Sequence, residues 1–155
     1  MSTGTYQPNQ NQRPQSGGQR TSQYSAPLSP SPVIVEEVKK YQQFEEFPAD
    51  KLVDYADKLG KYLRDSGIKT SQIRKFLDAV NRIRAEVNAN TFTNEPVILL
   101  KPKLAYATGR EKKIEPLLAV LSPCIDRTKT YKDFQKLVRF IESIVAYHKY
   151  YGGTD

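Results

Sequence analysis

One stretch of the sequence, from Gly67 to Val87, constrains the fold more than any other because it combines two patterns. Its apolar side chains recur at the spacing of one helical face, at Ile73, Phe76, Leu77, Val80, Ile83 and Val87. Its basic side chains fall on the far side, at Arg74, Lys75 and Arg82, with Lys69 just before the start. Thr70 or Ser71 is expected to cap the first turn. The stretch predicts a helix over about 71–87 that buries one face and presents cations on the other.

Two other long helices are predicted, one before this stretch and one near the end of the sequence. The first has Pro48 near its first turn and stops at Gly67, because proline is favoured at a helix start and glycine after a helix end. The last begins with Thr130 as its cap and Asp133 three residues on, and ends at residues 152–153.

Two shorter helices are predicted between these. Pro102 disfavours continuation of a helix through it, so a break is expected at Lys101 and a short helix over 102–108, closed by Gly109. The next carries apolar residues at helical spacing over 114–125. No useful strand alternation is present, so the sequence predicts an all-α fold, a compact bundle of about five helices.

The N-terminal part of the chain differs in composition from the rest. Residues 1–35 are rich in Gln, Pro and Ser, and their only cations are Arg13 and Arg20. Such a segment buries too little apolar surface to offset the entropy of ordering, so a disordered tail is predicted, with the helical domain over 36–153. A solubilising extension is favoured over a tether for nucleic acid. The segment 33–47 is left open between a short helix and an extended docking segment.

Charge and cysteine content narrow the class of protein. The formal net charge is +7, which favours an anionic partner, and the single cysteine, Cys124, fits a reducing compartment. No apolar run has the length of a membrane span, so a cytoplasmic protein without a membrane partner is expected. The positive charge is concentrated over residues 67–113, which hold 10 basic and 4 acidic side chains, or +6 net.

The basic residues of this region form one surface if the helix over 71–87 lies beside the segment 101–110. That surface would contain Lys69, Arg74, Lys75, Arg82, Lys101, Lys103 and Arg110. Clustered cations attract a nucleic-acid backbone by releasing its counterions, but solvated basic faces are also common. Both readings stay open on composition alone, as does the role of Tyr106, which either stacks on a base or packs in the core. Arg84 is expected on the core side or paired with an acid of another helix.

Residues for catalysis are scarce. His148 is the only histidine and falls on the apolar side of the last helix, where a packed or rim histidine is expected rather than a general base, and Cys124 is expected to be a buried thiol. No metal site of ordinary composition and no cofactor is predicted. The alternatives to a binding protein are a helical scaffold or adaptor with an incidental basic face, and a small enzyme that uses His148.

A second aromatic stripe lies beside the core face of the last helix, at Phe140, Tyr147 and Tyr151. A helix that is apolar on most sides needs a partner on each. Two coverings remain open: the aromatic residues Tyr41, Phe44 and Phe47 of the same chain, or another subunit.

Three motifs, in this order and at these separations, resemble the helical small subunit of type III-A CRISPR (Csm) effector complexes. They are KTSQIRKF over 69–76, LKPKLAYATGR over 100–110 and FIESIVAYHKYY over 140–151. The resemblance covers roughly residues 48–153. It implies a non-catalytic subunit that stacks with copies of itself in a minor filament, beside the backbone subunits and the large signature subunit.

The resemblance also implies what the basic face binds. In such a subunit it runs along the duplex of crRNA and target RNA and steadies the target without reading its sequence. Lys69, Arg74 and Lys75 match the first motif, and Lys101, Lys103 and Arg110 match the second. Arg82 is added from helical geometry rather than from the motifs.

Overall fold

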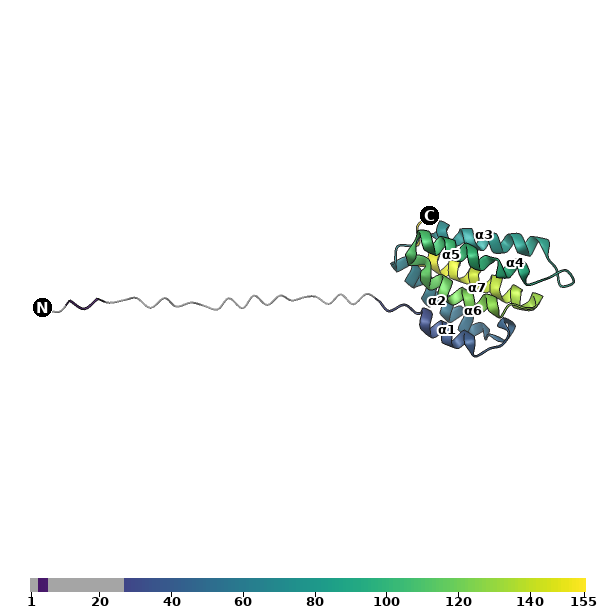
Figure 1. Cartoon of the computed structure of the whole chain (residues 1–155), viewed down its shortest axis with the longest axis horizontal. Coiled ribbons are helices and arrows are strands. Elements are labelled where there is room, and N and C mark those ends of the chain that lie inside the picture. Colours follow the sequence, from purple (N-terminus) through teal and green to yellow (C-terminus); the bar gives the residue numbers. More distant parts are fainter. Residues whose placement is uncertain (1–2, 6–26) are drawn as a thin grey trace.

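The computed structural model describes residues 3–5 and 27–155, and within them every regular element is a helix. The helices gather into one bundle (Figure 1). In chain order they are α1 (Ser31–Lys39), the 3-10 turn η1 (Phe44–Glu46), α2 (Ala49–Asp65), α3 (Thr70–Glu86), α4 (Glu95–Ile98), α5 (Leu100–Arg110), the 3-10 turn η2 (Lys112–Ile114), α6 (Glu115–Asp126) and α7 (Tyr131–Tyr150). The all-α prediction is confirmed, and the five longest helices are the five that were predicted.

Helix α7 organises the bundle because it packs against α2, α3 and η1. Its buried apolar side chains are Phe134, Leu137, Val138, Phe140, Ile141, Ile144 and Val145. The predicted cap is present: Thr130 Oγ1 accepts the Asp133 N–H at 3.2 Å, and the Asp133 carboxylate accepts the Thr130 N–H at 2.9 Å. The same carboxylate accepts the Glu45 N–H at 2.8 Å, which ties η1 to the start of α7.

Helices α2 and α7 approach most closely at Gly60. A Cβ placed there would lie 2.8 Å from the His148 backbone nitrogen, 3.0 Å from the Ile144 carbonyl oxygen and 3.0 Å from Tyr147 Cβ. These neighbours are backbone atoms or the base of a side chain, so none can turn away. Only glycine therefore allows α2 and α7 to pack at this spacing.

The start of α3 is held by residues from the C-terminal end of the chain. Thr70 is fully buried, with its Oγ1 3.0 Å from His148 Nδ1, and His148 Nε2 lies 2.7 Å from the Ile68 carbonyl oxygen. Because a carbonyl oxygen only accepts, Nε2 carries the proton and Nδ1 accepts from the Thr70 hydroxyl. The Thr70 N–H donates to the Thr154 carbonyl oxygen at 2.7 Å. The last residues of the chain thus fix where the basic helix begins.

The prediction that Thr70 or Ser71 caps the first turn of α3 is wrong. Neither Thr70 nor Ser71 caps the first turn, because the Thr70 hydroxyl is bonded to His148 and Lys69 is the N-cap residue. The Gln72 side chain instead reaches back and accepts the Lys69 N–H at 2.8 Å.

The break before α5 also differs from its predicted place. It lies at Leu99 rather than at Lys101, and Pro102 sits inside the first turn of α5. The first four N–H groups of a helix have no partner within it, so a proline there removes no hydrogen bond. The helix also runs through Gly109 to Arg110 instead of ending at residue 108.

The packed domain begins earlier than residue 36. Helix α1 buries Ile34 and Val38 and packs against α6. The Glu37 carboxylate accepts hydrogen bonds from Lys40 and from Lys51 of α2, which lowers the pKa of Glu37. Of the two possibilities left open for the segment 33–47, the structure shows the helix, followed by the turn η1, rather than an extended docking segment. The predicted disorder of the tail falls largely on residues 1–2 and 6–26, which lie outside the described residues.

The aromatic stripe on α7 is covered within the chain where it is deepest. The rings of Phe44 and Phe140 lie 6.0 Å apart, and both side chains are fully buried. Tyr151 is half-buried and donates its hydroxyl hydrogen to the carboxylate of Asp57 on α2, which raises its pKa to about 12. Of the two coverings left open by the sequence, the residues of the chain itself cover Phe140.

Candidate nucleic-acid interface

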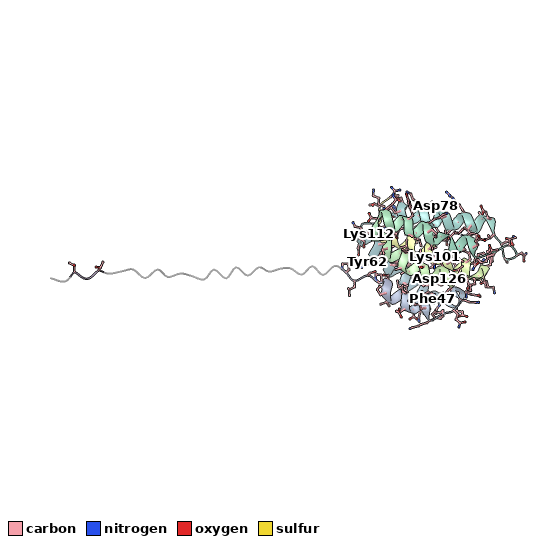
Figure 2. All side chains as sticks on the ribbon, viewed as in Figure 1. Phe47, Tyr62, Asp78, Lys101, Lys112 and Asp126 are labelled. Carbon is pink, nitrogen blue, oxygen red and sulfur yellow. The ribbon has the colours of Figure 1, made fainter. Side chains whose placement is uncertain are left out.

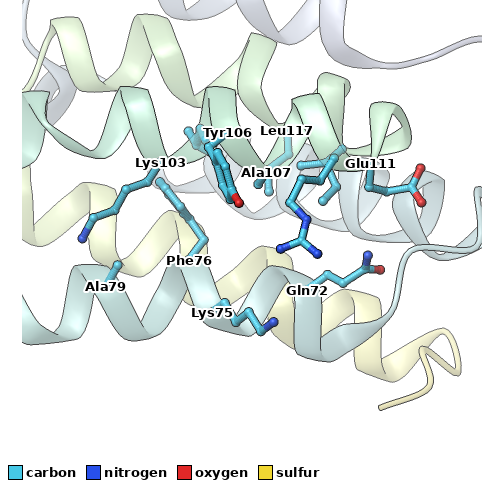
Figure 3. Close-up of a pocket in the computed structure, with 12 residues that line it drawn as sticks. Gln72, Lys75, Phe76, Ala79, Lys103, Tyr106, Ala107, Glu111 and Leu117 are labelled. Atoms are coloured by element: carbon cyan, nitrogen blue, oxygen red, sulfur yellow. The ribbon is translucent and has the colours of Figure 1, made fainter.

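The basic helix α3 and the basic segment of α5 are neighbours in the bundle. This is the condition under which the predicted cations could form one surface. Between them runs a groove with a volume of about 480 Å³, which we call the α3–α5 groove. It is lined by Gln72, Lys75, Phe76 and Ala79 of α3, by Lys103, Leu104, Tyr106, Ala107 and Arg110 of α5, and by Glu111, Ile114 and Leu117 beyond them. Figure 3 shows Lys103 and Tyr106 reaching from α5 toward α3, with Gln72 and Lys75 on the facing helix.

The groove has an apolar floor and a cationic rim. Phe76, Leu104 and Leu117 are all buried and belong to the core of the bundle. Lys75, Lys103 and Arg110 are exposed and line the groove from the two helices. The spacing of α3 explains the division, because Lys75 and Phe76 are adjacent residues that point about 100° apart around the helix.

One acidic side chain lines the same groove. Glu111 accepts the backbone N–H of Lys113 at 3.2 Å, and within the described residues it forms no ion pair with a groove cation. Lys75, Lys103 and Arg110 also form no ion pair in that part of the chain. Their charges are therefore available to an anion that enters the groove from solvent.

Lys101 is separated from the other cations. It is half-buried and forms an ion pair with Asp126 of α6, and the two residues lie next to each other in Figure 2. Lys101 and Lys103 are two positions apart on α5, so their side chains point to nearly opposite sides of the helix. The structure thus places Lys103 on the groove and Lys101 on the side of α6.

The remaining predicted cations lie elsewhere on α3. Arg82 is exposed and stands two turns beyond Lys75 on the same face of the helix, so it extends the line of the groove. Lys69 is the N-cap residue and is exposed. Arg74 is exposed on a neighbouring face, with its guanidinium 4.0 Å from the carboxylate of Asp155. The structure brings Lys75, Lys103 and Arg110 together, with Arg82 in line and Lys69 and Arg74 to one side.

Tyr106 is placed on the groove rather than in the core. Its side chain is 69% exposed, whereas the α5 residues Leu100 and Leu104 are each 1% exposed. The guanidinium carbon of Arg110 lies 5.9 Å from the centre of its ring, within the range of a cation–π contact.

Arg84 does not belong to this face. Its guanidinium lies 3.1 Å from the carboxylate of Glu142 on α7 and its side chain is exposed, so of the two predicted placements the pairing with an acid of another helix is the one observed, not the packing on the core. This pair sits beside a second, smaller hollow between α3 and α7.

A basic row on α7 was missed by sequence reasoning. Lys132, Lys136 and Arg139 follow one another at helical spacing along a hollow that also contains Glu45 and Glu142. Lys136 donates to the Glu45 carbonyl oxygen at 2.9 Å, and burial lowers its pKa. The helical spacing of these three cations could have indicated the row, but the region has a net charge near zero, so counting charges did not single it out. The acids in the hollow make it a weaker anion site than the α3–α5 groove.

The residues considered for catalysis are buried. His148 and Cys124 are both fully inaccessible, as predicted, and burial lowers the pKa of His148 and raises that of Cys124. Within residues 3–5 and 27–155, no group of His, Cys, Asp and Glu side chains is arranged to hold a metal ion. No helix in the same part of the chain is long and apolar enough to cross a membrane.

Comparison with known proteins decides the family. A model of the family described as Csm2 Type III-A matches residues 46–154, which include α2 to α7 and the whole groove. The chain belongs to the type III-A Csm2 family. It is therefore a small subunit of type III-A CRISPR complexes, and the resemblance given by the three motifs is confirmed.

Two proteins named "CRISPR system Cms protein Csm2" are similar to this Csm2-family chain. That of Streptococcus thermophilus is 31% identical over 103 residues, or 64% of this chain and 82% of that protein. That of Enterococcus italicus is 28% identical over 101 residues, or 58% of this chain and 72% of that protein. No solved structure gives a significant match.

Proposed function

We propose that this chain is a non-catalytic, cytoplasmic subunit that holds RNA against the type III-A complex through the α3–α5 groove. The observation that carries the proposal is the meeting of Lys75, Lys103 and Arg110 from two helices around one groove, without an acidic partner for any of them among the described residues. Arg82, Lys69 and Arg74 extend the contact along α3. Lys101 holds α5 to α6 in this proposal.

The RNA is the crRNA and its paired target, contacted through phosphates. A complex whose guide changes with every foreign sequence needs a subunit that accepts any sequence. Lysine and arginine contacts to phosphates position a nucleic acid without reading its bases. The side chains on the rim of the groove are of this kind.

Copies of the chain stack beside one another in this proposal, along the backbone subunits and next to the large signature subunit. Ile98 and Leu99, at the junction of α4 and α5, are 45% and 57% exposed and offer apolar surface for such contacts. Stacking would let weak contacts of single subunits add along the RNA. Light scattering of Ile98→Ser/Leu99→Ser should show less self-association than the native chain at equal concentration.

The direct test compares two triple variants of equal charge. The groove variant carries Lys75→Ala, Lys103→Ala and Arg110→Ala, and the control variant carries Lys39→Ala, Lys58→Ala and Lys61→Ala on α1 and α2. If each lost phosphate contact is worth about 1 kcal/mol, the groove variant loses about 3 kcal/mol, or roughly a hundredfold in Kd for RNA. Fluorescence anisotropy with a labelled single-stranded RNA measures both.

The control variant should bind within about twofold of the native chain, since its cations lie away from the groove. Equal binding by the native chain and the groove variant would contradict the proposal. The basic face would then be a solvated surface on a helical scaffold or adaptor.

A further inference from the structure

The α3–α5 groove contains more than phosphate contacts require. A phosphate backbone is held by cations on an open surface, and an apolar floor adds nothing to that contact. Here the rim cations surround a hollow of about 480 Å³ whose floor includes Phe76, Leu104 and Leu117. A hollow of this volume falls in the range of pockets that hold small organic ligands of about nucleotide size.

Tyr106 supplies an aromatic surface at the opening of this hollow. Its ring is 69% exposed, although the neighbouring apolar residues of α5 are buried, so core packing does not account for it. No hydrogen bond to its hydroxyl is found in the described part of the chain. In Figure 3 its ring extends from α5 into the space facing α3. Exposed aromatic rings among cations are the surfaces on which unpaired bases stack.

Polar groups complete the surroundings of the hollow. The Gln72 amide and the Glu111 carboxylate line it from α3 and from the end of α5. An amide and a carboxylate form hydrogen bonds with the edges of nucleobases, whereas a carboxylate repels phosphate. The hollow therefore combines an apolar floor, a stacking ring, edge-binding groups and a cationic rim.

We propose that the α3–α5 groove holds one unpaired RNA nucleotide, its base stacked on Tyr106 over the apolar floor and its flanking phosphates on Lys75, Lys103 and Arg110. This inference rests on the proposed function. A base inside a duplex is already stacked and paired, so it cannot enter the groove. The groove thus gives the subunit a preference for RNA with an unpaired position over a continuous duplex, independent of the sequence around it.

The test uses the full chain and two RNA probes, a short duplex and the same duplex with one bulged adenosine. The native chain should bind the bulged probe more tightly. Tyr106→Leu should lower affinity for the bulged probe about fivefold or more relative to its affinity for the continuous duplex, the loss of one stacked base. Tyr106→Phe retains the ring and should behave as the native chain. Tyr150→Leu, at a tyrosine of α7 that is 78% exposed, is the matched control and should have no effect.

Several results would overturn the inference. Equal affinity of the native chain for the two probes, or a Tyr106→Leu variant that keeps the preference, would show that no base enters. Displacement of the bulged probe by adenosine monophosphate at matched concentration would assign the groove to free nucleotides. A change of oligomeric state in Tyr106→Leu with unchanged RNA binding would assign it to a protein partner. Failure of the proposed function is distinct, because the groove triple variant would then bind both probes as the native chain does.

Discussion

Two glycine-to-alanine substitutions test whether a glycine within a helix is needed for close packing of two helices or only lowers the stability of its own helix. Gly60 lies in α2 and Gly109 in α5, and alanine is favoured over glycine within a helix by about 1 kcal/mol. At Gly109 nothing lies within 4 Å of an added Cβ, so Gly109→Ala should raise the free energy of unfolding by about 0.5 to 1 kcal/mol.

At Gly60 the same methyl group would lie 2.8 Å from the His148 nitrogen and 3.0 Å from the Ile144 carbonyl oxygen. Helices α2 and α7 must separate to accept it, and overpacking of this kind typically costs about 1 to 3 kcal/mol. After the gain in helix propensity, Gly60→Ala should still lower the free energy of unfolding, by up to about 2 kcal/mol.

Urea denaturation followed by circular dichroism measures both variants against the native chain. The unfolding midpoint should fall for Gly60→Ala and rise for Gly109→Ala, with an unchanged dependence on urea. A Gly60→Ala variant as stable as the native chain would show that α2 and α7 do not pack at the spacing described.

Three further outcomes follow from buried and paired side chains. The free energy of unfolding should be constant above the ordinary histidine pKa of 6.5 and fall below it, because the pKa of His148 is lowered in the folded chain and the unfolded chain therefore binds the proton first. Urea denaturation at a series of pH values should show this fall, and the His148→Asn variant should show less of it. Cys124, whose thiol donates to the Val120 carbonyl oxygen and whose pKa is raised by burial, should react with a thiol reagent only at the rate of unfolding, so rapid labelling of the native chain would contradict its burial. Removal of the exposed Arg84–Glu142 pair should cost less than about 1 kcal/mol in a double-mutant cycle and leave RNA affinity unchanged.

The helices could be predicted because their apolar side chains repeat at helical spacing and their ends carry local signals. The Thr130 cap of α7 depends on residues three positions apart, so the sequence contains all of it. The packed position of His148 followed from its place on the apolar face of α7. In each case the determining contacts lie within one helix or on one of its faces.

Features that depend on two helices could not be predicted in the same way. Gly60 contributes no side chain to an apolar pattern, so its contact with α7 leaves no periodic signal. Thr70 was assigned to a cap because the His148 that binds its hydroxyl is distant in sequence. The start of α1 was missed because Ser31 and Pro32 were counted with the Pro- and Ser-rich tail, although proline is favoured in the first turn of a helix.

The candidate site was also predictable only where it depends on single helices and not where it depends on how two helices pack. The cations of 67–113 were identified by charge, and the three motifs gave the family. Which cations share a groove depends on how α3 and α5 pack, and that packing separates Lys103 from Lys101. Tyr106 stayed ambiguous in the sequence because a tyrosine beside apolar residues fits either side of a helix. In the structure its side chain is 69% exposed.

The central claim is that the cations of the α3–α5 groove hold RNA phosphates, and the salt dependence of RNA affinity tests it most directly. For single strands, affinity falls as salt rises, and the slope of log affinity against log salt has a magnitude of about 0.7 for each phosphate contact. The groove triple variant should therefore have a slope smaller by about 2 than the native chain, while the control triple variant keeps the native slope. Identical slopes for the native chain and the groove variant would contradict the account.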